Sequence, residues 1–209
     1  MRRFTCAQLF VTDIGWCKVK PMKLRSELPL VLKLVFKVDG VTEKMICDGA
    51  PEQVSGEAAR LCQLADCTVQ QLERGTPWSN REEGHVGIVK SEILLDLKES
   101  KSSMMLWCYA AEKRGKILAS TSRNIYSLGG QVPATVLTGQ HMDISALAET
   151  GWYEWLYYRD SESSFPYPVE RVARCLGPCD HKGKLMSQYI INDQGIVMPY
   201  QTFRRLAKD

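Results

Sequence analysis

The spacing of hydrophobic and polar residues predicts alternating strands and helices over residues 1–122. Residues 4–12 and 16–22 alternate loosely and are rich in β-formers, and Asp13-Ile14-Gly15 between them is typical of a turn, so we expect a β-hairpin. A mostly apolar run follows Ser26 and stops near Asp39-Gly40, as in a buried helix. Further elements are expected in the order strand, amphipathic helix, strand, helix and helix, at 44–47, 52–65, 67–72, about 80–103 and 104–120. This order predicts an α/β domain, with helices on the faces of a mixed sheet.

The pattern is lost after residue 122. Residues 123–150 have no clear period and contain Gly129-Gly130, Pro133 and Gly139, which is typical of a connector.

The last part of the chain, 151–209, contains short β-like runs. They span 172–176, 185–191 and 195–203, and Asp193-Gln194-Gly195 is typical of a hairpin turn. Short strands joined by tight turns predict a small antiparallel barrel. The residues expected to point into it are Val172, Leu176, Tyr189, Ile191, Val197 and Phe203.

Composition is that of an ordinary globular protein, with 24% charged and 44% hydrophobic residues in a chain of 209. No apolar run reaches the roughly 18–20 residues of a membrane span, because Lys33 interrupts the longest one. Met1-Arg2-Arg3 leads directly into a short, partly polar segment without a cleavage site, which argues against a signal peptide. We therefore expect an intracellular protein without a membrane partner.

Eight cysteines raise the question of disulfides or a metal site. The only ligand-like cluster is Cys175-x-x-x-Cys179-x-His181, and it lacks the second pair that structural zinc usually has. The other six lie in apolar stretches, where buried thiols are common in a reducing compartment. They are Cys6, Cys17, Cys47, Cys62, Cys67 and Cys108.

Charge is distributed unevenly, although the net charge is only +3. Residues 41–100 hold six Lys or Arg against eleven acids, whereas residues 1–40 hold eight against three. An acidic centre flanked by basic segments fits a cation site within a polyanion-binding protein, and it fits many unrelated proteins too.

Two acidic residues stand out by their position. Asp48 directly follows a predicted buried strand, and Glu83 lies in the first turn of the long helix, with thirty-four residues between them. Carboxylates brought together at the ends of elements are ligands for hard cations such as Mg²⁺, and paired ions serve phosphodiester chemistry. The local alternatives are a turn aspartate and a glutamate that stabilises the helix dipole.

The segments that contain these two acids, 45–53 and 76–84, resemble integrases of retroviruses and copia-type retrotransposons. They are most similar to Pol polyproteins of elements from single-celled eukaryotes. The resemblance continues through Leu106-Trp107-Cys108-Tyr109 and the segments at 151–155 and 174–178, so it covers nearly the whole chain. It implies a ribonuclease H-like catalytic core at 1–122, a connector at 123–150, and an SH3-like, nucleic-acid-binding barrel at 151–209.

The resemblance also implies a metal-binding triad of two aspartates and a glutamate that holds Mg²⁺ or Mn²⁺. The second aspartate corresponds to Asp48 and the glutamate to Glu83, or to Glu82 if the register slips by one. The first belongs to an opening strand that we expect to be missing from this chain, and Asp13, the only early acid, falls in the hairpin turn. The family's N-terminal His/His/Cys/Cys zinc module is missing as well. We therefore expect weak binding of one ion and little or no strand transfer by residues 1–209 alone.

Four further residues are candidates for DNA contacts. Lys90 lies seven residues after Glu83 on the same helix face. Its side chain is expected either to contact a DNA phosphate beside the metal site or to be exposed to solvent. Asn80 is expected to cap the helix and to shape the site. Arg204 and Arg205 offer phosphate contacts near the C-terminus. The aromatic residues at 152–158 suit base stacking, or the core of the small barrel.

The function implied by the resemblance is that of an integrase fragment. The intact protein would bind element-end DNA, trim its 3′ ends and join them to target DNA, as a homo-oligomer in the nucleus. The alternatives are a non-catalytic nucleic-acid-binding module, a decayed element fragment, or a structural interaction protein on the same fold. A missing opening strand would also expose the hairpin edge and favour association with another chain.

Overall fold

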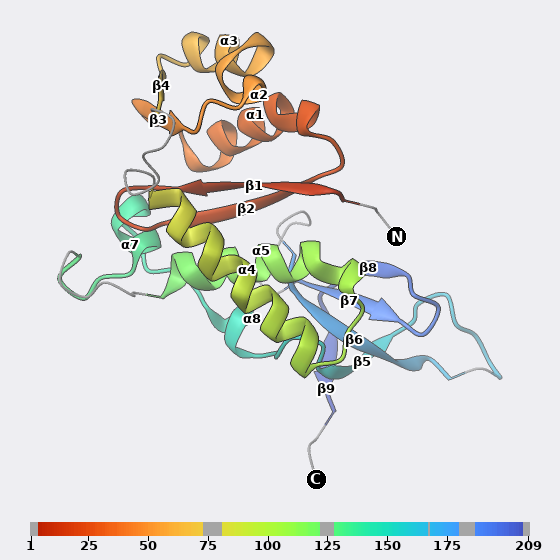
Figure 1. Cartoon of the computed structure of the whole chain (residues 1–209). Helices are drawn as coiled ribbons and strands as arrows, with labels where there is room; N and C mark the ends of the chain where they lie inside the picture. The colour runs from red at the N-terminus through yellow and green to blue at the C-terminus, as the bar shows by residue number, and fades with distance from the viewer. Residues whose placement is uncertain (1–3, 73–80, 122–127, 167, 180–186, 207–209) are drawn as a thin grey trace.

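A computed structural model of the chain describes residues 4–72, 81–121, 128–166, 168–179 and 187–206. It is a mixed α/β structure in which helices cover both faces of an N-terminal hairpin (Figure 1). The hairpin strands are β1 (Cys6–Val11) and β2 (Cys17–Met22), which pair antiparallel as expected. The turn is closed by the Gly15 amide, which donates to the Thr12 carbonyl at 3.0 Å, and Gly15 has a φ of 81° that favours glycine.

The next segment forms a second small unit around two parallel strands. The single helix expected over 52–65 is divided in two at Ser55 and Gly56, where Ser55 is extended and Gly56 adopts a φ of 66°. The elements are η1 (Arg25–Glu27), α1 (Leu28–Asp39), β3 (Lys44–Cys47), α2 (Pro51–Val54), α3 (Gly56–Leu64) and β4 (Thr68–Gln71). Within the described part of the chain, β1–β2 and β3–β4 are separate two-stranded sheets. The continuous mixed sheet expected from the sequence is therefore not formed among these residues.

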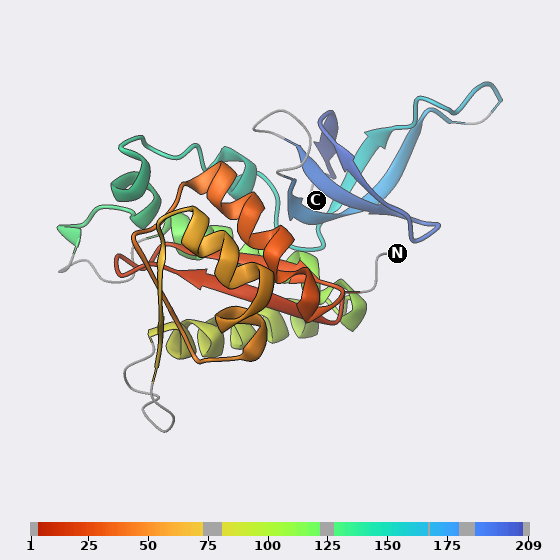
Figure 2. The same ribbon diagram turned by 90° about the horizontal axis from the view of Figure 1, so that it is seen from above.

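The two faces of the hairpin bury different side chains, because successive residues of a strand point to opposite sides. Leu9, Cys17 and Val19 belong to a core shared with α4 (Arg81–Glu99) and α5 (Trp107–Ser120). Cys6, Phe10 and Met22 face α1 and α3 instead. In Figure 1 the hairpin accordingly runs between α1 and α3 above it and α4 and α5 below it, and Figure 2 shows α1 lying across it.

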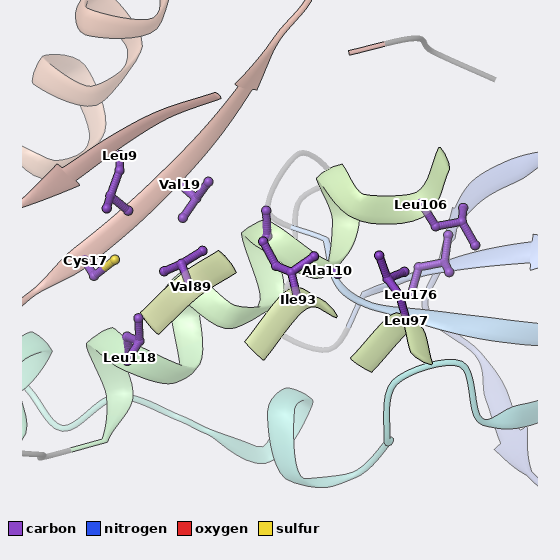
Figure 3. Close-up of a cluster of buried hydrophobic side chains, with 11 residues drawn as sticks. Leu9, Cys17, Val19, Val89, Ile93, Leu97, Leu106, Ala110, Leu118 and Leu176 are labelled. Atoms are coloured by element: carbon purple, nitrogen blue, oxygen red, sulfur yellow. The ribbon is translucent and has the colours of Figure 1, made fainter. Parts of the chain in front are cut away.

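The long helix α4 and the helix α5 form an antiparallel pair, and the short turn η3 (Met104–Leu106) lies between them in the chain. Val89, Ile93 and Leu97 of α4 point toward α5 and the hairpin (Figure 3). Gly115 lets α5 approach β2 closely, since a Cβ there would lie 2.9 Å from the Val19 side chain. Asp96 of α4 accepts a 2.7 Å hydrogen bond from Arg114 Nε, which joins the two helices.

The described part of the connector includes the short helices α7 and α8, and the chain then enters a five-stranded antiparallel sheet of order β8-β7-β6-β5-β9. β8 and β9 lie at opposite edges of the sheet although only residues 201–202 separate them, so the sheet must curl on itself. Gly195, with a φ of 74°, makes the expected turn between β7 and β8. The elements are α7 (Pro133–Thr138), α8 (Ser145–Ala148), β5 (Trp155–Arg159), β6 (Glu170–Pro178), β7 (Gln188–Asn192), β8 (Val197–Tyr200) and β9 (Phe203–Arg205).

The interior of the curled sheet differs from the expected one. Val172 is 39% exposed, so its predicted inward position is wrong. Val172 and Leu176 alternate with Ala173 and Cys175, which face the interior, so the prediction placed the wrong set of β6 residues inside. Phe203 does pack on the interior core of Leu156, Tyr158, Ala173, Cys175 and Ile190. The remaining four expected residues join the core around α5, and these are Leu176, Tyr189, Ile191 and Val197.

Candidate functional site

One face of the curled sheet gathers arginine and aromatic side chains. Trp155, Tyr157 and Arg159 alternate with the buried Leu156 and Tyr158, so they share the outer face of β5. The strand register places Trp155 opposite Arg174 of β6 and Tyr157 opposite Arg204 of β9. We call these five residues, Trp155, Tyr157, Arg159, Arg174 and Arg204, the Arg–aromatic face.

Two guanidinium groups of this face are stacked on aromatic rings. Arg174 Cζ lies 3.4 Å from the centroid of the Trp155 ring and 4.8 Å from that of Tyr153, and its Nη1 donates to the Tyr153 carbonyl at 2.9 Å. Arg204 Cζ lies 4.6 Å from the centroid of the Tyr157 ring. Desolvation against the rings lowers the pKa of Arg174, but a guanidinium stays charged in proteins. The face therefore presents fixed cations beside a tryptophan that is 43% exposed.

The charges of the face are only partly neutralised by acids. Arg204 pairs with Glu170 at 3.2 Å, but both side chains are more than 60% exposed, at 66% and 62%, so the pair holds them weakly. Arg205, a residue expected to contact phosphate, pairs instead with Glu154 at 2.8 Å, where Glu154 is mostly buried. Arg159 and Arg174 form no ion pair with an acid among the described residues.

The two candidate metal-binding acids lie in the other half of the chain. Asp48 is exposed at the end of β3, and its Oδ1 accepts a long 3.4 Å hydrogen bond from the Ala50 amide. Gly49 beside it has a φ of 83° and lies against the Gln71 side chain, which fixes the turn. Glu83 is exposed in the first turn of α4. Within the described part of the chain, no group of three or more His, Cys, Asp or Glu side chains is arranged to hold a metal ion.

The other sequence candidates have varied surroundings. Lys90 is exposed on α4, and Asp13 lies in the hairpin turn, where its Oδ1 accepts from the Ile14 amide at 3.0 Å. Asn80 and the side chain of Glu82 lie outside the described residues.

The cysteines are all free thiols, as expected for buried cysteines. Cys175 Sγ lies 3.2 Å from Thr150 Oγ1 and 3.6 Å from Gln188 Oε1 in the interior of the curled sheet. Burial there raises the pKa of the Cys175 thiol, so the thiolate needed for metal binding is disfavoured. His181, the third residue of the ligand-like cluster, lies outside the described residues.

Sequence reasoning missed Arg174 and Arg159. A single arginine in a strand carries no signal of its own, and only the pairing register sets Arg174 opposite Trp155. The alternation of Trp155, Tyr157 and Arg159 at every second position was the available signal, because a strand exposes such residues together.

Comparisons with known proteins reach only distant structures. No protein-family model matches the chain, and no curated protein matches its sequence. A chain in the cryo-EM structure of the simian T-cell lymphotropic virus intasome in complex with PP2A regulatory subunit B56 gamma matches with a TM-score of 0.49 and 15% identity, over 97% of this chain and 75% of that one. The HTLV-2 integrase catalytic core domain, in complex with magnesium and in a trimeric form, matches with a TM-score of 0.48 and 16% identity, over 66% of this chain and 84% of that one. Likenesses this distant assign no function.

None of the described helices is long and apolar enough to cross a lipid bilayer.

Proposed function

We propose that the chain is an integrase-type region that binds nucleic acid through the Arg–aromatic face of its C-terminal sheet. The observation that carries the proposal is the stack of Arg174 on Trp155, with Arg204 on Tyr157 beside it. Exposed aromatic rings stack on bases, and guanidinium groups bind phosphates through paired N–H donors. A sheet face that combines both suits a single strand or an unpaired DNA end.

The stacked arrangement favours binding because it is organised in advance. An arginine side chain normally loses considerable rotamer freedom when it is fixed on a ligand. Arg174 is already held by two rings and by the Tyr153 carbonyl, so less freedom remains to be lost on binding.

Catalysis belongs to the proposal only for the intact integrase. Asp48 and Glu83 offer exposed carboxylate oxygens, which are the donors that Mg²⁺ and Mn²⁺ take. Two carboxylates suit one weakly bound ion, whereas phosphoryl transfer with two ions requires ligands that hold and bridge both. The chain by itself is therefore proposed to bind DNA with little or no 3′ processing or strand transfer. The proposal also includes homo-oligomer formation, a nuclear location, an SH3-like C-terminal barrel and a ribonuclease H-like core. These parts rest on the sequence resemblance to integrases.

The binding proposal is tested by the anisotropy of a fluorescein-labelled oligothymidylate titrated with the full chain. Trp155→Ala removes a stacking surface whose loss costs about 1–3 kcal/mol per base, and should weaken binding by about 5- to 150-fold. Arg60→Ala on α3 is the control, since Arg60 is an exposed residue outside the sheet. Equal affinity of the wild type and Trp155→Ala would contradict the proposal.

The catalytic part is tested by DNA joining in the presence of Mn²⁺. The wild-type chain and Glu83→Gln are both expected to give little or no product, while DNA binding persists in both. Efficient joining that Glu83→Gln abolishes would show that the chain assembles a full metal site, and Asp13 would then be the first residue to test as its third ligand.

A non-catalytic nucleic-acid-binding module is the second candidate. It is favoured by the lack of a three-residue acidic or metal-binding group among the described residues. The two candidates differ in metal binding: calorimetric titration with MnCl₂ should give a signal that Asp48→Asn removes only if the acids form an integrase-type site.

A further inference from the structure

We propose that Tyr157 carries a second base-stacking position on the Arg–aromatic face, which an ion pair closes in the free protein and a nucleic-acid phosphate opens. The ion pair is that of Arg204 with Glu170. The position belongs to the same single-stranded nucleic-acid site, so it rests on the proposed function. It makes Arg204 the group that moves and Glu170 a residue that determines which ligands bind.

The Arg204 side chain crosses a whole strand to reach its acidic partner. The sheet order places β5 between β9, which contains Arg204, and β6, which contains Glu170. Neighbouring strands lie about 4.8 Å apart, so the backbones of these two residues are separated by roughly twice that distance. Arg204 Nη2 nevertheless lies 3.2 Å from Glu170 Oε2. The arginine side chain therefore lies across β5 and does not stand up from the sheet.

Tyr157 is the residue beneath this side chain. It stands directly opposite Arg204 in the register of β5 and β9, and Arg204 Cζ lies 4.6 Å from the centroid of its ring. Tyr157 is half-buried, whereas Trp155, two residues earlier on the same face, is 43% exposed. The guanidinium thus occupies the outer surface of the Tyr157 ring, on which a base would otherwise stack.

The ion pair is arranged diagonally, although a more direct partner is present. Arg159 stands directly opposite Glu170 in the register of β5 and β6, and opposite charges at such positions commonly pair. Arg159 forms no ion pair among the described residues, and Glu170 pairs with Arg204 instead. The acid is therefore placed where it holds an arginine over the Tyr157 ring.

Movement of Arg204 would uncover a continuous apolar platform. Val172 of β6 stands directly opposite Tyr157 and is 39% exposed on the same face. Trp155 lies two residues from Tyr157 along β5, which is twice the rise of about 3.3 Å per residue. Two neighbouring bases of an extended strand could then stack side by side, one on Trp155 and the other on Tyr157 and Val172.

The two stacked arginines differ in how firmly they are held. Arg174 contacts two rings, at 3.4 and 4.8 Å, and donates to the Tyr153 carbonyl. Arg204 contacts one ring, and both members of its ion pair are exposed to solvent, where such a pair contributes little. Arg174 is therefore the fixed cation of the face, and Arg204 is the one that can leave its ring.

A phosphate of the ligand competes with Glu170 for Arg204. Both are anions that accept paired N–H bonds from a guanidinium group. When a phosphate takes Arg204, the guanidinium leaves the Tyr157 ring and the adjacent base takes its place. A ligand without a charged linkage beside that base gains nothing from the exchange. The closed ion pair therefore favours polynucleotides over free bases and neutral aromatic molecules.

The first experiment measures the affinity of the full chain for fluorescein-labelled octathymidylate by fluorescence anisotropy. Glu170→Gln removes the acid that holds Arg204, so the affinity should rise by about two- to fivefold, as expected for the loss of an exposed ion pair. Glu162→Gln is the matched control, because Glu162 is an exposed acid in the loop between β5 and β6 and its replacement changes the net charge equally. It should leave the affinity at the wild-type value.

The second experiment identifies the rings on which bases stack. Octathymidylate with 5-iodouracil in place of thymine forms crosslinks on irradiation to aromatic side chains stacked on it, and tandem mass spectrometry locates the modified residue. Crosslinks to both Trp155 and Tyr157 are expected. The yield at Tyr157 should rise in Glu170→Gln, because the closed state is lost, and it should be unchanged in Glu162→Gln.

The outcomes separate this position from the proposed function. If the chain does not bind octathymidylate at all, both are refuted. If Trp155→Ala weakens binding while Tyr157 gives no crosslink and Glu170→Gln binds like Glu162→Gln, only the second stacking position is refuted. Weaker binding by Glu170→Gln than by the wild type would also overturn it, because Glu170 would then hold Arg204 in place for the ligand.

Discussion

Replacing Arg174 with alanine should reduce both the strength and the salt dependence of single-stranded DNA binding. Three arginines of the Arg–aromatic face lack a strong acidic partner among the described residues, namely Arg159, Arg174 and the exposed Arg204. If each neutralises one phosphate, the slope of log K against log salt is about −0.7 per contact, or about −2 for the face. The slope of Arg174→Ala should therefore be about −1.4.

The assay is anisotropy of labelled oligothymidylate at several NaCl concentrations between about 50 and 200 mM, the range over which counterion release is readily measured. Arg60→Ala, which removes an equal charge from α3, should leave the slope at the wild-type value. A wild-type slope near zero, or identical slopes for the wild type and Arg174→Ala, would refute the assignment of phosphate contacts to this face.

Three further predictions concern stability and metal binding. Gly177→Ala should lower the free energy of unfolding by about 2–5 kcal/mol in urea denaturation, because Gly177 has a φ of 103° and a Cβ there would lie 3.2 Å from the Lys113 Cβ. Gly195 has a φ of 74° but open space around it, so the control Gly195→Ala should cost only about 1–2 kcal/mol. Equal losses for the two variants would contradict the packing argument. Burial lowers the pKa of Lys113, so on raising the pH the folded state loses this proton before the unfolded state does. The free energy of unfolding, relative to that of Lys113→Met at the same pH, should therefore rise with pH between the folded pKa and the ordinary value of 10.5. A constant difference between the two proteins from pH 7 to 10 would disprove this. Asp48→Asn should abolish the weak Mn²⁺ binding measured by calorimetry. Because Asp48 is exposed, the melting temperature of the metal-free protein should change by no more than about a degree or two. Retained Mn²⁺ binding would show that the ion binds elsewhere.

The local elements of this protein were largely predictable from its sequence. Hairpin turns at Gly15 and Gly195 depend on residues that tolerate positive φ, and the helices at 28–39 and 107–120 depend on apolar runs of sufficient length. Such features arise from interactions between neighbours in the chain, so a sequence contains them directly. The division of the helix near Gly56 and the strand at 155–159 were missed, because glycine and aromatic residues are compatible with more than one local structure.

The arrangement of side chains for function required the tertiary structure. Val172 points outward and Leu176 toward α5, because Ala173 and Cys175 of the same strand face the interior, and a shift of one residue in a strand exchanges its two faces. The stack of Arg174 on Trp155 joins residues from different strands. Sequence alone determined most of the segments that form strands and helices, whereas long-range packing decided which residues face one another, because register and edge exposure depend on partners distant in the chain.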